Sequence, residues 1–152
     1  MAFKSSTGLR NALLDSNNFT GLMNDGVLRI YSGTVPSSAD DAISGDSTLL
    51  CEITDNGQSL AGGTGIDFDS AASGGTITKD PNQTWKGTNA ASGTATYFRV
   101  VQQEDGGGSS TTDERIQGTV GTSGADLNLS SVSLSSGADQ TVDAFSATLP
   151  AS

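Results

Sequence analysis

The sequence contains no histidine among its 152 residues. Histidine is the most common general base at neutral pH and a frequent ligand of transition metals. Its absence excludes Ser-His-Asp and Cys-His catalytic arrangements and most zinc sites. The composition therefore predicts a protein that is not an enzyme and that uses no cofactor and no metal.

Cysteine is almost as scarce, because Cys51 is the only one. An internal disulfide is therefore impossible, and folding must rest on packing and hydrogen bonds. Leu49, Cys51 and Ile53 share one face of an alternating run. This position predicts that Cys51 is a small core residue and not a nucleophile.

Positively charged residues are also few. Seven Lys and Arg stand against 17 Asp and Glu, which gives a net charge of −10, and the cations are scattered along the chain. Binding to DNA needs clustered cations that displace counterions from the phosphates. We therefore expect neither a nucleic acid nor a membrane as a partner.

Long apolar runs are missing as well. No stretch approaches the roughly 18–20 apolar residues of a membrane-spanning helix. The first residues, 1–6, lack the apolar core of a signal peptide. We therefore expect synthesis in a cytoplasm.

Large aliphatic residues and Phe are also few, at about a fifth of the chain. At that level a high net charge begins to favour disorder. Two compatible interpretations follow. The chain is a thin β-sandwich with long loops, or it is a domain that gains the missing burial by assembling with partners.

What the sequence does contain is alternation. Beyond residue 26, apolar and polar residues alternate with the period of two that indicates β-strands. The strongest run, 95–101, is rich in β-branched and aromatic side chains. Weaker runs are separated by turns rich in Gly, Ser and Asp. The pattern predicts an all-β domain over residues 26–152, an antiparallel β-sandwich or jelly roll of about eight strands.

Two expected loops are long, 33–46 and 55–75, and loops of this length are usually functional or disordered. The second loop holds Asp67 and Asp69, which would share one face if the segment were a strand. Aromatic platforms for a sugar are nearly absent, and the later Gly and Glu ligands of a calcium loop are missing. Solvated surface charge is therefore the favoured interpretation, with an incidental Ca²⁺ site left open.

Two further features favour structure over chemistry. The glycine-rich stretches 62–65 and 106–108 lack the lysine that a phosphate-binding loop requires. Trp85 is the only tryptophan, and such a residue usually anchors a core or an interface. Neither feature indicates a ligand site.

Residues 1–25 do not share the period-two pattern. Thr7 could cap a short helix through residues 9–14, so the segment is expected to be extended or short-helical. Two alternatives remain open: the segment packs on its own sheet, or it is an arm that docks on another subunit. In the second case seven large apolar residues are the candidate partner-binding residues: Phe3, Leu9, Leu13, Leu14, Phe19, Leu22 and Met23.

Two sets of motifs carry a family resemblance. The first set comprises residues 6–14 and 26–40, and the second comprises 85–87, 91–95, 97–99 and 118–127. Together they cover about half of the chain and contain no residues that point to a reaction. They resemble small structural proteins encoded in the head-gene region of tailed bacteriophages. In size, acidity and expected fold the chain resembles capsid decoration, or cement, proteins.

The resemblance implies a non-enzymatic virion protein made in the cytoplasm of a bacterial host. Such a protein would bind the outside of the phage head, stabilise the lattice of the major capsid protein and form a homo-oligomer. A tail, head-fibre or receptor-binding structural module is the alternative. A receptor binder should expose aromatic residues at a loop tip, and here most aromatic residues lie on expected strands or near the N-terminus.

Overall fold

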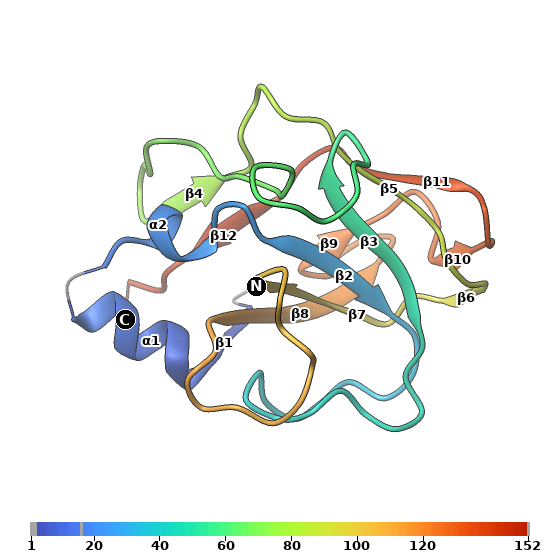
Figure 1. Cartoon of the computed structure of the whole chain (residues 1–152), viewed down its shortest axis with the longest axis horizontal. Helices are drawn as coiled ribbons and strands as arrows, with labels where there is room; N and C mark the ends of the chain where they lie inside the picture. Colours follow the sequence, from blue (N-terminus) through green and yellow to red (C-terminus); the bar gives the residue numbers. More distant parts are fainter. Residues whose placement is uncertain (1–2, 16, 152) are drawn as a thin grey trace.

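The computed structural model of the chain describes residues 3–15 and 17–151 (Figure 1). Strands dominate, and the two helices are short and lie near the N-terminus. Within the described ranges, neither helix has the length and hydropathy needed to cross a membrane. The elements in chain order are β1 (Lys4–Ser5), α1 (Thr7–Leu14), α2 (Phe19–Met23), β2 (Val27–Tyr31), β3 (Leu49–Asp55), β4 (Thr76–Thr78), β5 (Trp85–Thr88), β6 (Gly93–Thr94), β7 (Tyr97–Val101), β8 (Arg115–Gly121), β9 (Leu127–Asn128), β10 (Ser133–Leu134), β11 (Asp139–Val142) and β12 (Ser146–Thr148).

One main sheet organises the fold. Its strand order is β1-β8-β7-β2-β3-β5-β11, with every neighbouring pair antiparallel, and β9 pairs in parallel with the far end of β8. Two small antiparallel ribbons, β6–β10 and β4–β12, complete the strands. The expected all-β, antiparallel class is confirmed. The main sheet is open, because β11 ends it without pairing to β9 or β1.

The apolar face of the main sheet follows from the period-two pattern. Register places Leu28 beside Val100 and Ile30 beside Phe98 on one side of the sheet. Seven residues form this face, all fully buried: Leu28, Ile30, Cys51, Ile53, Phe98, Val100 and Ile116. Burying each large side chain contributes roughly 1.5–3 kcal/mol.

An aromatic cluster packs over one end of the apolar face. The Phe68 and Trp85 rings meet edge to face with centroids 5.4 Å apart, and Phe98 meets Phe145 in the same way at 5.5 Å. Trp85 is a core residue, as expected. Gly118 on β8 makes room for the cluster, because a Cβ there would lie 2.7 Å from the Phe98 ring.

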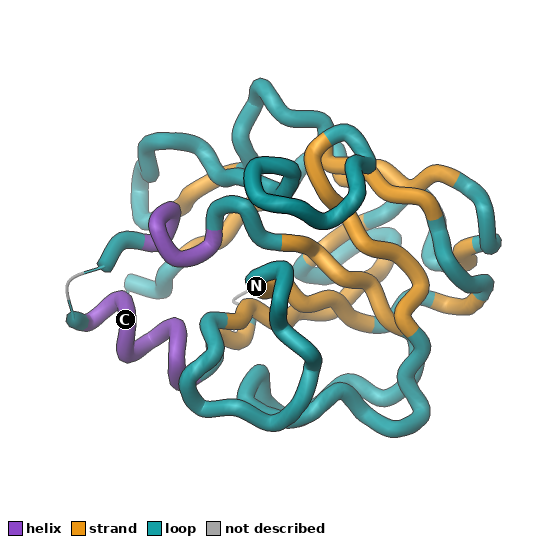
Figure 2. Tube along the Cα trace, in the orientation of Figure 1, coloured by secondary structure: helices purple, strands orange, loops and turns teal. Residues whose placement is uncertain are grey.

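The polar face, on the other side of the same strands, is formed by Arg29, Glu52, Arg99, Arg115 and Gln117. Two loops cover it (Figure 2): loop A, residues 32–48, and loop B, residues 102–114. The loops lie side by side, because Ile43 N–H donates to Gly107 O and Ser110 N–H donates to Asp40 O, both at 2.9 Å.

The N-terminal segment is joined to the rest of the molecule. β1 pairs with β8, placing Ser5 opposite Ile116. The N-cap of α1 is Ser6, whose hydroxyl accepts from Leu9 N–H at 3.1 Å, so the expectation of a Thr7 cap is wrong. Thr7 instead donates to Asp40 on loop A through its N–H and its hydroxyl. In the described structure the segment therefore packs on its own domain.

Candidate functional site

The described residues contain no cluster of side chains placed to hold a metal ion. Cys51 is fully buried, and burial raises the pKa of its thiol to about 12, so it is not a nucleophile at neutral pH. Across residues 3–15 and 17–151, no group of three or more Cys, Asp and Glu is placed to hold a metal ion. The candidate functional features of the described residues are therefore surfaces and clefts.

The carboxylates near the long loop 55–75 act as structural acceptors. Asp25 accepts from Gly65 N–H at 2.8 Å and from Gly63 N–H at 2.9 Å. Asp67 accepts from Asp25 N–H at 2.8 Å, which ties the loop to the turn before β2. The carboxylate of Asp69 accepts from the hydroxyl of its neighbour Ser70 at 3.5 Å. These bonds order a loop whose composition alone left disorder open.

An ion pair lies beneath loops A and B on the polar face. Arg115 donates to both carboxylate oxygens of Asp105, at 2.6 and 2.9 Å, and the two side chains are 1% and 3% exposed. Such bidentate, charge-assisted contacts are the strong class of hydrogen bond. Arg115 also donates to Ala39 O at 3.2 Å, so one guanidinium group contacts both loops.

Arg99 and Arg29 extend this contact along the sheet. Arg99 donates to Gln117 Oε1 at 2.9 Å and to Asp41 O on loop A at 2.7 Å. Arg29 donates to Glu52 Oε2 at 2.8 Å and to Asp105 O on loop B at 2.6 Å. The polar face thus holds its two covering loops through their backbone carbonyl groups.

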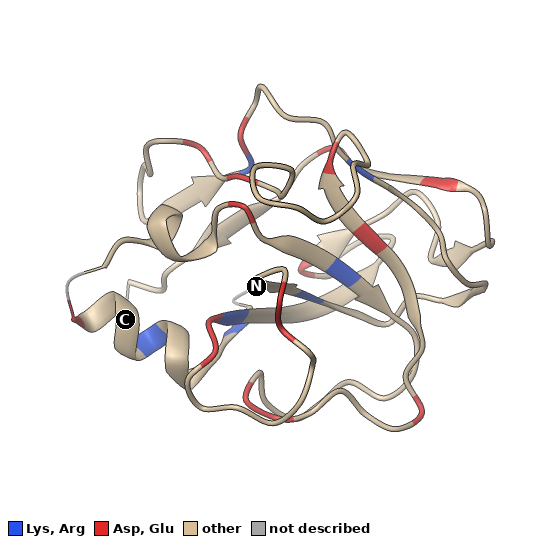
Figure 3. Ribbon diagram, in the orientation of Figure 1, with Lys and Arg blue, Asp and Glu red and all other residues tan. Residues whose placement is uncertain are grey.

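These contacts bury Arg99 and Arg115 at 1% exposure each and leave the Arg29 side chain 13% exposed. The other four cations, Lys4, Arg10, Lys79 and Lys86, are half-buried or exposed, and acidic residues occupy the loops around them (Figure 3). The described surface is therefore more one-sidedly acidic than the composition implies. Sequence reasoning missed this layer, although the signal existed: Arg29, Arg99 and Arg115 all alternate with the apolar face.

The seven candidate partner-binding residues are not equivalent. Leu9 and Met23 lie in the core, at 1% and 0% exposure, so neither can contact a partner in this structure. Phe3, Leu13, Phe19 and Leu22 are half-buried and pack against the core. Only Leu14, at the end of α1, is free, with 84% of its surface exposed. Docking through α1 would therefore use Leu14 first.

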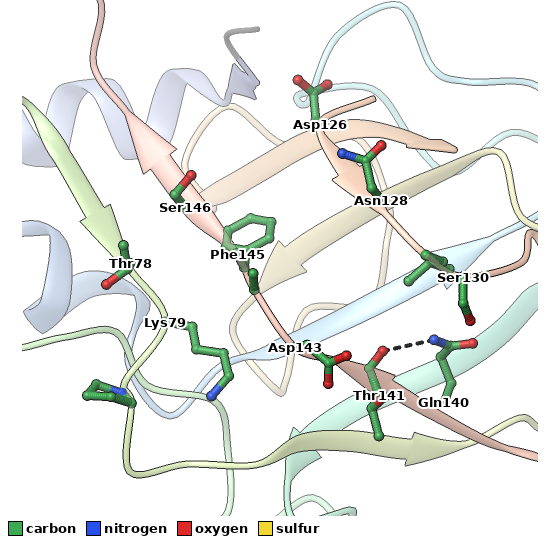
Figure 4. Close-up of a pocket in the computed structure, with 13 residues that line it drawn as sticks. Thr78, Lys79, Asp126, Asn128, Ser130, Gln140, Thr141, Asp143, Phe145 and Ser146 are labelled. Atoms are coloured by element: carbon green, nitrogen blue, oxygen red, sulfur yellow. Dashed lines mark hydrogen bonds between the residues drawn. The ribbon is translucent and has the colours of Figure 1, made fainter. Parts of the chain in front are cut away.

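One cleft, the edge cleft, lies between β9 and the segment that runs from β11 into β12 (Figure 4). Its volume is about 770 Å³. Leu129 and Phe145, both nearly buried, supply apolar lining. The other lining residues are mostly polar: Thr78, Lys79, Pro81, Asp126, Asn128, Ser130, Gln140, Thr141, Asp143, Ala144 and Ser146.

Aromatic residues do not mark a receptor-binding tip. Every aromatic side chain in the described part of the chain is buried or half-buried, and most belong to the core. Tyr31 and Tyr97 stack beneath loop A with ring centroids 5.1 Å apart, and the Tyr97 hydroxyl bonds to Ser47. The exposed surface is therefore acidic and weakly apolar.

Comparisons with known proteins identify no relative, so the function must be inferred from the fold and the surfaces. No protein-family model, no curated protein and no solved structure matches the chain. Any functional statement must therefore rest on the residues themselves and on the motif resemblance described above.

Proposed function

We propose that this chain is a non-enzymatic capsid decoration protein of a tailed bacteriophage. It binds the outside of the head and stabilises the lattice of the major capsid protein. The motifs at 6–14, 26–40, 85–87, 91–95, 97–99 and 118–127 supply the resemblance. The structural observation that supports it is the acidic surface that results when Arg29, Arg99 and Arg115 are drawn under the loops.

An acidic surface suits the exterior of a shell. The interior of a filled head is crowded with DNA phosphates, which repel an anionic protein. Cementing requires no active site, since any preference for the assembled lattice stabilises that lattice by mass action. Weak contacts repeated at many equivalent sites multiply the effect.

The proposed fold is a β-sandwich built around one large sheet. The ribbons β4–β12 and β6–β10 contribute Ile77, Ala147 and Leu134 to the side of the core that faces the main sheet. A homo-oligomer, as the resemblance implies, is also part of the proposal.

The test uses heads of the phage that encodes the chain, prepared with and without its gene. Purified protein added to heads that lack it should bind in a fixed ratio to the major capsid protein and should raise the temperature at which the heads release DNA. Quantitative mass spectrometry of intact virions gives the copy number. A copy number matching a single tail, or protein found only on tails, would instead identify the alternative tail or fibre role.

A point variant tests which surface docks. Leu14→Ser should weaken binding to heads by about tenfold or more, because an exposed leucine buried at an interface contributes roughly 1.5–3 kcal/mol. Leu60→Ser is the matched control, since Leu60 is 38% exposed in the loop 55–75. Equal binding by the two variants would exclude α1 from the interface.

A further inference from the structure

The last strand of the main sheet has an unpaired edge. β11 pairs only with β5, and Asn89 N–H donates to Ala138 O at 2.8 Å where the two strands meet. Hydrogen-bonded and non-bonded pairs alternate in an antiparallel ladder. Gln140 and Val142 therefore bond to β5, while the backbone N–H and C=O groups of Asp139 and Thr141 point away from the sheet.

The opposite edge of the same sheet is also open. β9 pairs in parallel with β8, and Leu129 N–H donates to Gly121 O at 2.8 Å. In a parallel pair only alternate residues bond to a given neighbour. The backbone groups of Asn128 therefore point away from β8. Asn128 and Thr141 both line the edge cleft, so this cleft lies between two open edges of one sheet (Figure 4).

Two polar groups at the cleft are incompletely satisfied. The outward carbonyl of Thr141 is capped only by the side chain of Gln140, whose Nε2 donates to it at 2.9 Å (Figure 4). Asp126 uses one carboxylate oxygen to accept from Thr119, while its Oδ1 is buried and has no hydrogen-bond partner among the described residues. The Thr141 carbonyl belongs to an exposed residue and can accept a hydrogen bond from a ligand, whereas the buried oxygen of Asp126 is not accessible to one.

The charge of the residues around the cleft indicates the charge of a ligand that would bind there. Asp126 and Asp143 line the cleft, and Asp139, whose carboxylate forms an exposed ion pair with Lys86 at 3.8 Å, lies on the open strand beside it. Lys79 is the only cation in the lining, and its amine already donates to Asp80 O and to Gln83 O. The cleft is therefore anionic, and a cationic ligand is favoured.

We propose that the edge cleft binds an extended segment of another protein, rich in lysine or arginine, which adds to β11 as a further strand. Backbone groups of Asp139 and Thr141 would bond to the segment, and its cations would face the exposed carboxylates of Asp139 and Asp143. A second copy of this chain is a poor occupant, because it is itself strongly acidic and has no cluster of cations. The proposal rests on the sheet edges and does not depend on the capsid assignment.

The test measures binding of a synthetic peptide in which lysine and valine alternate. We expect saturable binding in calorimetry and slower hydrogen exchange at the amides of Asp139 and Thr141. Thr141→Pro removes an outward N–H without touching the β5–β11 bonds, so the variant should fold and bind about tenfold or more weakly. Thr141→Val keeps the N–H and should bind as the unchanged protein does.

Three outcomes would overturn the proposal. The first is no saturable binding of the lysine peptide at low salt. The second is equal binding of a peptide in which glutamate and valine alternate, since it would show that charge does not select the ligand. The third is binding without added protection of the Thr141 amide, which would show general attraction to an acidic surface. The protection measurement uses the unchanged protein and decides the matter even if Thr141→Pro fails to fold.

Discussion

The two faces of the main sheet are stabilised in different ways. The apolar face buries large side chains such as Phe98 against the aromatic cluster, and its stability grows with area. The polar face holds loops A and B through guanidinium groups that donate to carboxylate and carbonyl oxygens. The comparison explains how a chain with few large apolar residues can fold. Only one face of its sheet needs an apolar covering.

The two faces also differ in how strictly they specify a single arrangement of the structure. Apolar contacts tolerate small shifts, whereas Arg115 fixes the distance from β8 to both loops through directional bonds. Buried ionic groups give little net stability, but they can specify one arrangement among several. We therefore expect the apolar face to supply most of the free energy of folding and the polar face to set where the loops lie.

The largest effect is expected from the apolar face. Trp85→Ala should lower the free energy of unfolding by about 4 kcal/mol, because it empties space at the centre of the aromatic cluster. Urea denaturation measures the loss. Leu149→Ala is the control, since Leu149 is 59% exposed and should change stability by less than about 0.5 kcal/mol. A loss below about 1 kcal/mol for Trp85→Ala would contradict the role given to this face.

The second largest effect is expected on the polar face, from removing the counter-charge of Arg115. Asp105→Asn should cost about 3 kcal/mol, because it leaves the buried guanidinium of Arg115 without its counter-charge. The matched control is Asp113→Asn, which alters the other carboxylate on Arg115. Asp113 is 3.2 Å away and its side chain is 50% exposed, so the cost should stay below about 1 kcal/mol. Similar losses for the two variants would show that burial of the pair is unimportant.

The apolar face could be predicted from the sequence, whereas the contacts of the polar face with loops A and B could not. Alternation around Leu28, Ile30 and Cys51 is local, and it identified the strands and their inward residues. The loop contacts join residues far apart in the chain, such as Arg115 with Ala39, and no local pattern encodes their pairing. The strand order that places Thr141 across a cleft from Asn128 is likewise a tertiary property.

Prediction from local sequence is limited in the same way for the N-terminal segment. Its apolar residues were visible, but whether they face a partner or the core depends on how β1 pairs with β8. Leu9 and Met23 prove to be core residues, while Leu14 is exposed. Ser6, with an extended backbone, is the cap, and Thr7 bonds to Asp40, a residue of loop A that local sequence does not bring near.

The smallest expected effect is a loss of stability at low pH. It distinguishes the two faces of the sheet without any substitution. Hydrogen bonds from Thr7 hold the pKa of Asp40 below its usual 3.8, and bonds from Thr34 do the same for Asp46. A carboxyl group whose pKa is lower in the folded state adds stability that is complete above the unfolded pKa. That stability is lost as the pH falls from about 3.8 through the folded value.

Acidification should therefore release loop A before it affects the apolar face, which carries no titrating contact of this kind. Hydrogen exchange followed from pH 7 to below pH 3.8 should show the amides of Thr7 and Thr34 losing protection first, while Val100 stays protected. Asp46→Asn keeps a carbonyl acceptor for Thr34 but cannot titrate, so in this variant the protection of Thr34 should no longer depend on pH in that range. Simultaneous loss at Thr34 and Val100 would show that the two faces unfold as one unit, and the comparison would fail.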